Sequence, residues 1–138
     1  MTISIKPITP DDLDDFVTSV GRLFREDAGT RDPARNVQWA AQHGAGYYRT
    51  QIGQTSSLLL LARDGAGEPL GHLIGRLGGP SDMWTIRYAT LESIQVNDTA
   101  RGRGVGTALV EQFTSWARAN DAERMYVTAY AANEGALR

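Results

Sequence analysis

The sequence contains no cysteine among its 138 residues, which excludes a disulfide framework, a thiolate metal site and a cysteine nucleophile. Its two histidines, His43 and His72, stand far apart in the sequence and do not suggest a zinc site. No stretch approaches the roughly eighteen consecutive apolar residues of a membrane span, and the N-terminus lacks the pattern of a signal peptide. These absences predict a cytoplasmic protein with no metal and no membrane partner.

The chain also has no excess of positive charge. The formal net charge is −2, and Lys6 is the single lysine of the chain. Binding to a nucleic-acid backbone requires a basic surface, so nucleic acid is not predicted as a partner. The length suits a single domain over residues 1–138 with a hydrophobic core of its own.

The stretch 91–117 combines the end of a strand, a turn and the start of a helix. Ile94 and Val96 alternate with polar residues, as in a strand with one buried face. Turn-forming residues then precede three alternate glycines, where a helical pattern begins. The apolar residues of that pattern recur at the spacing of one helical face: Val105, Ala108, Leu109, Phe113, Trp116 and Ala117.

Gly102, Gly104 and Gly106 make this turn suited to a phosphate group. The first N–H groups of a helix have no partner within it, and the helix dipole adds positive potential there. Glycines let a phosphate approach the backbone closely, and Arg101 and Arg103 can form forked hydrogen bonds to its oxygens. The pattern predicts a phosphate or pyrophosphate ligand. An ordinary glycine-rich turn is the alternative, but such turns rarely contain two arginines and three alternate glycines.

Two common phosphate-binding patterns do not fit this turn. The P-loop requires a lysine after its last glycine, and Lys6 lies far away. The dinucleotide fingerprint requires Gly-x-Gly-x-x-Gly, whereas the glycines here are spaced Gly-x-Gly-x-Gly. The spacing Arg-x-x-Gly-x-Gly, from Arg101 to Gly106, resembles the coenzyme A (CoA) pyrophosphate loop of the GNAT superfamily of acyl-CoA-dependent N-acetyltransferases. The strand before the loop and the helix after it resemble the same family.

This resemblance implies acetyl-CoA as the co-substrate and names the residues that would hold it. The pyrophosphate would lie on the backbone of the glycine loop, and the pantetheine arm would pair with the end of the preceding strand. Asn133 resembles a family asparagine that contacts the cofactor, with a helix N-cap as an equal alternative. The implied cofactor-binding residues are Ile94, Gln95, Val96, Arg101, Gly102, Arg103, Gly104, Val105, Gly106, Thr107 and Asn133.

The first half of the chain predicts a short strand over 3–6 and then two helices. Thr9 and Pro10 mark the start of the first helix, because Thr is a good N-cap and Pro suits the first helical position. Gly29 predicts the end of this helix. A weaker helix is expected toward Tyr48, loosened or broken near Gly44, since a glycine in a helix interior costs about 1 kcal/mol relative to alanine.

The remaining strands are predicted at 58–62, 69–77, 84–96 and 125–130, with a hairpin turn at 64–67. The order of elements resembles the GNAT fold: an α/β (α+β) domain with a mixed, mostly antiparallel central sheet flanked by helices. Compared with the usual family pattern, the last two strands are missing from this sequence. A truncated chain and a naturally short member both remain open.

The missing segment leads to an expectation about association. The outer edge of the strand 125–130 would be unpaired, and an open apolar edge invites pairing with another chain. A homodimer through this edge, or poor behaviour in solution, is therefore expected. Acetyl transfer by the short chain is expected to be weak, whereas the CoA loop should still form.

Acetyl transfer to an amine requires a base, because a protonated alkylammonium, with a pKa of about 10.4, has no lone pair. Glu92 is the candidate base, since several GNAT enzymes place a glutamate at a similar position. The alternative is a strand glutamate paired with an arginine or exposed to solvent. Tyr130 is the candidate general acid, and the alternative, an aromatic residue that packs in a strand, is the more common case. The resemblance also implies a backbone N–H near Ile94 as the oxyanion donor, if this strand splays as the family's does.

The acceptor site is expected near Trp39, His43, Tyr47 and Tyr48, where GNAT proteins build it, although packing alone explains any one of these residues. His72 is interpreted as structural. The favoured function is an N-acetyltransferase that moves acetyl from acetyl-CoA to a primary amine of a small molecule or peptide by direct attack in a ternary complex. The alternative is a non-catalytic acyl-CoA-binding or interaction module. Glu92 favours the enzyme, and the missing segment favours the module.

Overall fold

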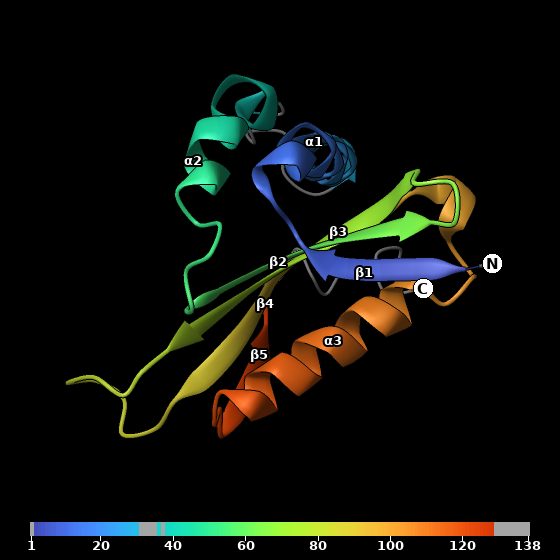
Figure 1. The fold of residues 1–138 in the computed structure, drawn as a ribbon. Coiled ribbons are helices and arrows are strands. Elements are labelled where there is room, and N and C mark those ends of the chain that lie inside the picture. The colour runs from blue at the N-terminus through green and yellow to red at the C-terminus, as the bar shows by residue number, and fades with distance from the viewer. Residues whose placement is uncertain (1, 31–35, 37, 129–138) are drawn as a thin grey trace.

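The computed structural model describes residues 2–30, 36 and 38–128, and these form one five-stranded sheet with helices on both faces (Figure 1). The strand order is β1-β2-β3-β4-β5; the first four strands are antiparallel to their neighbours, and β5 runs parallel to β4. The elements are β1 (Ile3–Pro7), α1 (Leu13–Thr30), α2 (Ala45–Arg49), β2 (Ser57–Asp64), β3 (Pro69–Gly78), β4 (Tyr88–Val96), α3 (Val105–Ala119) and β5 (Arg124–Val127). The predicted mixed, mostly antiparallel sheet is confirmed.

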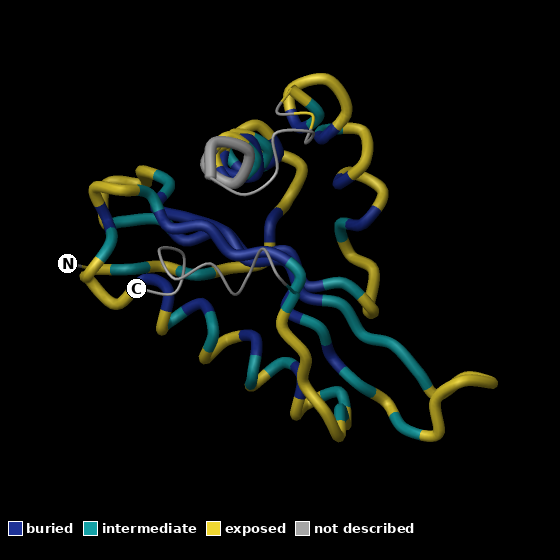
Figure 2. Tube along the Cα trace, turned by 180° about the vertical axis from the view of Figure 1, so that it is seen from behind, coloured by how far each residue is buried: buried dark blue, intermediate teal, exposed yellow. Residues whose placement is uncertain are grey.

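Two apolar clusters lie on opposite faces of the sheet. The helix α3 covers one face, and its Leu109 and Phe113 pack against β2, β3 and β4. The helices α1 and α2 cover the other face, where Phe16 and Tyr48 meet edge to face at a ring separation of 5.1 Å. Buried residues concentrate on the central strands between these layers (Figure 2). None of the helices in the described ranges is long and apolar enough to cross a membrane.

The predicted start of the first helix is confirmed. A 3₁₀ turn, Pro10–Asp12, opens the helix, and the Asp12 carboxylate accepts hydrogen bonds from the Thr9 N–H and hydroxyl. The helix α1 ends at Thr30, one residue after the predicted break at Gly29. Helix boundaries vary by about one or two residues between assignments, so the predicted end agrees with the structure.

The second helical region is loosened at Gly44, which is one of its two expected forms, and it is not broken there. Residues Ala40–Gly44 form a π-helical turn that passes directly into α2. Gly44 has ordinary helical backbone angles, and an added Cβ would lie 3.2 Å from both γ-carbons of Val17 on α1. The glycine therefore allows close helix packing here, and the widened turn takes the place of a break. The start signal at Asp32 and Pro33 lies outside the described residues.

The predicted strand 84–96 is too long at its beginning, because β4 starts at Tyr88. The backbone groups of Trp84 are used in a turn instead: Ser81 N–H donates to the Trp84 carbonyl, and Trp84 N–H donates to the Ser81 carbonyl. The Trp84 ring lies against Tyr88 at 5.1 Å and against Tyr126 at 6.2 Å. The aromatic residues do alternate, but the alternation begins before Tyr88, the first residue of β4 that pairs with β3.

A bulge interrupts the pairing of β3 with β4 next to Glu92. Ile74 pairs with Ser93 and Gly75 pairs with Leu91, so Glu92 has no partner in the register. The residues that face α3 have odd numbers before the bulge and even numbers after it. Ala89 and Leu91 belong to the same cluster on the α3 face as Ile94 and Val96. A bulge of this kind directs two successive side chains to one face. Glu92 and Ser93 consequently both face the α1 side.

The strand β5 forms an edge of the described sheet. Its four residues are exposed, and Met125, Tyr126 and Val127 are apolar. Association of two chains through this edge stays a prediction, and the last part of the predicted strand, 129–130, lies outside the described residues.

His72 joins α1 to the two central strands through a fully buried chain of hydrogen bonds. Its Nδ1 lies 2.6 Å from Ser19 Oγ, and its Nε2 lies 2.9 Å from Ser93 Oγ. The ring is fully buried, and this burial lowers the pKa of His72 to about 3. A neutral imidazole offers one donor and one acceptor, which suits two hydroxyl partners. The structural interpretation of His72 agrees with this geometry.

The depressed pKa of His72 predicts a loss of stability on mild acidification. The unfolded chain binds a proton near pH 6.5, whereas the folded chain does so only near pH 3. The free energy of unfolding should therefore fall as the pH drops below 6.5, by about 2 kcal/mol between pH 7.5 and pH 5. Urea unfolding at these two pH values measures the change.

His72→Gln should flatten this pH dependence, because glutamine keeps a donor and an acceptor but does not titrate. His43→Gln is the matched control, since His43 is the other histidine and its side chain is exposed. An equal pH dependence in the wild type and in His72→Gln would contradict the assignment.

Candidate active site

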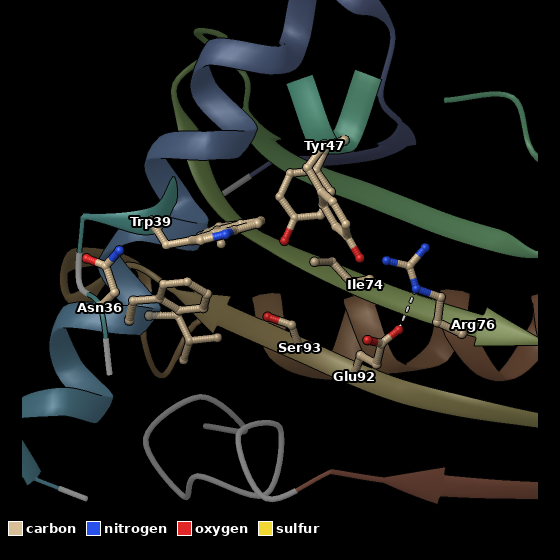
Figure 3. Close-up of a pocket in the computed structure, with 11 residues that line it drawn as sticks. Asn36, Trp39, Tyr47, Ile74, Arg76, Glu92 and Ser93 are labelled. Carbon is tan, nitrogen blue, oxygen red and sulfur yellow. Dashed lines mark hydrogen bonds and ion pairs between the residues drawn. The ribbon is translucent and has the colours of Figure 1, made fainter. Parts of the chain in front are cut away.

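A pocket of about 400 Å³ opens on the α1 face of the sheet (Figure 3). It lies between α1, the segment that leads into α2, and the bulged part of β3 and β4. Its lining residues are Val20, Leu23, Phe24, Asn36, Trp39, Tyr47, Tyr48, Ile74, Arg76, Glu92 and Ser93. The bulge and the helices before β2 therefore form the pocket together.

Three of the four residues predicted for the acceptor site line the pocket. Trp39, Tyr47 and Tyr48 line it, with Trp39 and Tyr47 in an edge-to-face contact at 5.3 Å. His43 is exposed and is not among the lining residues. Burial raises the pKa of Tyr48, so its hydroxyl remains protonated and available as a donor.

Glu92 lines the pocket and pairs with an arginine on the neighbouring strand. Arg76 Nε donates to Glu92 Oε2 at 2.5 Å, while Arg76 Nη1 donates to Ser57 Oγ at 2.7 Å. The Glu92 side chain is 40% exposed. One carboxylate oxygen is thus held by Arg76, and Figure 3 draws this pair at one end of the pocket. The arginine partner agrees with the structural alternative for Glu92 and does not exclude a role as base.

Ser93 brings a hydroxyl into the same pocket, and the sequence analysis did not select it. Its Oγ is held by His72, so its position depends on the buried contact to α1. Arg76 was also missed. The one sequence signal for Arg76 was a charged residue within an otherwise apolar strand pattern, and neither its pairing nor the bulge was visible there.

The glycine loop has the backbone geometry that its sequence suggested. Gly102 and Gly104 have φ angles of 79° and 84°, which favour glycine, and a Cβ built at either would meet nothing within 4 Å. Gly104 is the N-cap of α3, and no side chain caps this end. Open space therefore lies in front of the first N–H groups of α3, as a phosphate site requires.

The two arginines of the loop differ in their surroundings. Arg101 Nε donates to the Val96 carbonyl at 3.0 Å, and its Nη1 pairs with Asp98 at 2.8 Å. Arg101 thus braces the turn between β4 and α3. Arg103 is exposed, as are Gly102, Gly104 and Thr107.

The side chains at the end of β4, the implied pantetheine strand, are buried. Ile94, Gln95 and Val96 are completely buried. The described pairing of β4 with β5 runs to Leu91 and Val127. Thr128, the last described residue, donates its N–H to the Leu91 carbonyl and its hydroxyl to the Glu92 carbonyl.

Two of the predicted site residues, Tyr130 and Asn133, lie outside the described residues. Within the described ranges, no group of three or more His, Asp or Glu side chains is arranged to hold a metal ion.

Comparisons with known proteins agree with this fold. The family model described as the acetyltransferase (GNAT) family matches residues 21–138. No curated protein sequence matches the chain. The structure is similar to that of a variant of the BH1408 protein from Bacillus halodurans, with a TM-score of 0.82 and 16% identity over 95% of this chain and 85% of that chain.

Two similar structures are described as N-acetyltransferases. The aminoglycoside 6'-N-acetyltransferase AAC(6')-Ih from Acinetobacter baumannii has a TM-score of 0.73 and 23% identity over 96% of this chain and 82% of that chain. The ribosomal-protein-alanine N-acetyltransferase from Brucella melitensis has a TM-score of 0.65 and 16% identity over 92% of this chain and 80% of that chain. These identities establish the fold alone. The family model spans most of the sequence, and the chain therefore belongs to the GNAT family of acetyltransferases, which in general use acetyl-CoA.

Proposed function

We propose that residues 1–138 form one N-acetyltransferase domain that moves an acetyl group from acetyl-CoA to a primary amine by direct attack in a ternary complex. The bulge in β4 is the observation that supports this proposal most. It directs Glu92 and Ser93 into the pocket, and the same strand ends at Val96, from which a 3₁₀ turn, Asp98–Ala100, leads to the open glycine loop of α3. A strand that links an acceptor pocket to a phosphate cradle suits a transfer between two bound substrates.

The glycine loop is the proposed site of the CoA pyrophosphate. The free N–H groups at the start of α3 and the space in front of Gly102 and Gly104 fit a pyrophosphate. Arg103 is the exposed cation beside it, while Arg101 holds the loop to Val96. The backbone of 94–96 is the proposed support of the pantetheine arm. The bound thioester would supply the acetyl group and a thiolate leaving group.

Glu92 is the proposed general base. Its Oε2 is occupied by Arg76, and Oε1 is the oxygen that would accept the proton of the amine, directly or through water. The amine nitrogen then forms the new bond to the acetyl carbon as the carbon–sulfur bond breaks. Ser93, next to Glu92 in the pocket, can donate a hydrogen bond to a polar group of either substrate.

Aminoglycosides are named in the descriptions of some similar structures, and a ribosomal-protein alanine is named in another. Both are candidate acceptors for this chain. A non-catalytic acyl-CoA-binding module is the second candidate function. The ion pair between Arg76 and Glu92 favours it, because a structural glutamate would have the same partner.

The CoA site can be tested at Gly104. Gly104→Ala should weaken CoA binding by about tenfold or more, because the new methyl group enters the space proposed for the phosphate. Isothermal titration calorimetry with CoA measures the affinity. Gly67→Ala is a matched control, since Gly67 also has a positive φ of 85° and no atom within 4 Å of an added Cβ, but lies in the turn between β2 and β3. Equal CoA affinity of the two folded variants would contradict the placement.

The base role can be tested with Glu92→Gln. This change keeps an oxygen acceptor for Arg76 but cannot take a proton at neutral pH, so kcat should fall about 10²-fold or more. The KM for acetyl-CoA should change little. Asp15→Asn is a control that weakens another carboxylate–arginine pair, Asp15 with Arg63, outside the pocket. Turnover near that of the wild type from pH 6 to 9 in Glu92→Gln would favour the structural role.

A further inference from the structure

The pocket has two chemically different ends. In Figure 3, Arg76 and Glu92 lie at one end, Asn36 and Trp39 lie at the other, and Tyr47 lies over the middle. At the end near Trp39, the Phe24 ring from α1 lies 5.8 Å from the Trp39 ring, and α1 also contributes the apolar Val20 and Leu23 to the lining. Such a cavity matches a molecule that is polar at one end and apolar at the other.

From this arrangement we propose that the acceptor is a compact monoamine with a flat apolar body. Its amine lies beside Glu92 and Ser93, and its body lies against the rings of Trp39 and Tyr47. This inference rests on the proposed acetyltransferase function and names the substrate class of the same pocket.

The charges of the pocket favour a single amine. Glu92 is the one carboxylate among the described lining residues, and Arg76, the one cation among them, pairs with it. These two formal charges cancel. An acceptor with several ammonium groups would place further positive charges in a partly enclosed space where the described lining residues offer no second carboxylate, which is costly. One amine needs one carboxylate oxygen, and Glu92 Oε1 is available for it.

The aromatic rings favour a flat apolar body. Trp39 meets Tyr47 at 75° and Tyr48 at 84°, while Tyr47 meets Tyr48 at 81°. These edge-to-face contacts form an angled aromatic wall that an aromatic or flat aliphatic group can pack against. The rings also attract an ammonium group that enters before it loses its proton. A volume of about 400 Å³ lies toward the small end of typical ligand pockets and suits a body of about one ring system.

The test compares acceptors on the full chain with acetyl-CoA, by following free thiol release. The panel contains phenethylamine as the compact aromatic monoamine, butylamine as a monoamine without a ring, spermidine as a polyamine, and kanamycin as a polycationic aminosugar. We expect kcat/KM for phenethylamine to exceed that for each of the other three by about tenfold or more. A preference for spermidine or kanamycin would overturn the inference while leaving the acetyltransferase proposal intact.

Variants of the aromatic wall test whether the selectivity arises there. Trp39→Ala should raise the KM for phenethylamine about tenfold and leave that for butylamine within about twofold, whereas Trp39→Phe should keep most of the preference. Tyr47→Ala is a second variant, chosen because Tyr47 is 48% exposed and its loss disturbs the core least. Equal changes in KM for phenethylamine and butylamine in folded variants would overturn the placement of the acceptor's ring against Trp39 and Tyr47.

A binding measurement separates this inference from the enzyme proposal. If no amine is acetylated, the proposed function fails, and calorimetry of phenethylamine with the CoA-bound chain then decides the inference. Binding that Trp39→Ala weakens and Trp39→Phe retains would support the pocket assignment. The absence of binding would overturn it.

Discussion

The β-bulge at Glu92 is the constraint on which the candidate site depends. In a regular strand, Glu92 and Ser93 would face opposite sides of the sheet, and one of them would enter the α3-face core. The extra residue places both on the α1 side, while Leu91 and Ile94 keep their places in the opposite core. The described ladder with β5 runs to Leu91, beside the same bulge. One local irregularity therefore directs two polar side chains into a pocket, on the same strand that leads to the glycine loop.

The bulge is supported from both faces of the sheet. On the α3 face, a Cβ at Gly75 would lie 2.8 Å from the Phe113 ring, so α3 packs directly on the strand backbone beside the bulge. On the α1 face, Ser19 and His72 hold the hydroxyl of Ser93. The bulged strands that line the pocket thus pack against the apolar clusters on both faces of the sheet. The hydroxyl of Ser93 is held by buried contacts rather than by a surface loop. Precise placement of reactive groups commonly requires such support.

Features that depend on neighbours in the sequence could be predicted from it. The cap at Thr9, the apolar face of α1 and the glycine loop each follow from a few adjacent residues, and the structure contains all three elements. The bulge, the Arg76–Glu92 pair and the polar chain through His72 depend on the register between strands. Register is set by packing across the sheet, which one sequence does not display. For the same reason, Ser93 had no local signal that set it apart from any other strand serine.

Packing between elements decides the details near α2 and at the start of β4. The helix is loosened at Gly44, as one expected form had it, and the missing side chain lets the π-helical turn pack against Val17 of α1. Alternating aromatics predicted a strand from residue 84, but the backbone of Trp84 is paired with Ser81 in a turn. There the ring contacts of Trp84 with Tyr88 and Tyr126 accompany a turn that outweighs the local strand preference. The packing near α2 forms the pocket wall, since the π-helical turn at Ala40–Gly44 leads from Trp39 into the helix of Tyr47 and Tyr48. The acceptor side of the pocket therefore depends on packing between elements, which local patterns do not display, whereas the glycine loop on the proposed cofactor side follows from a few adjacent residues.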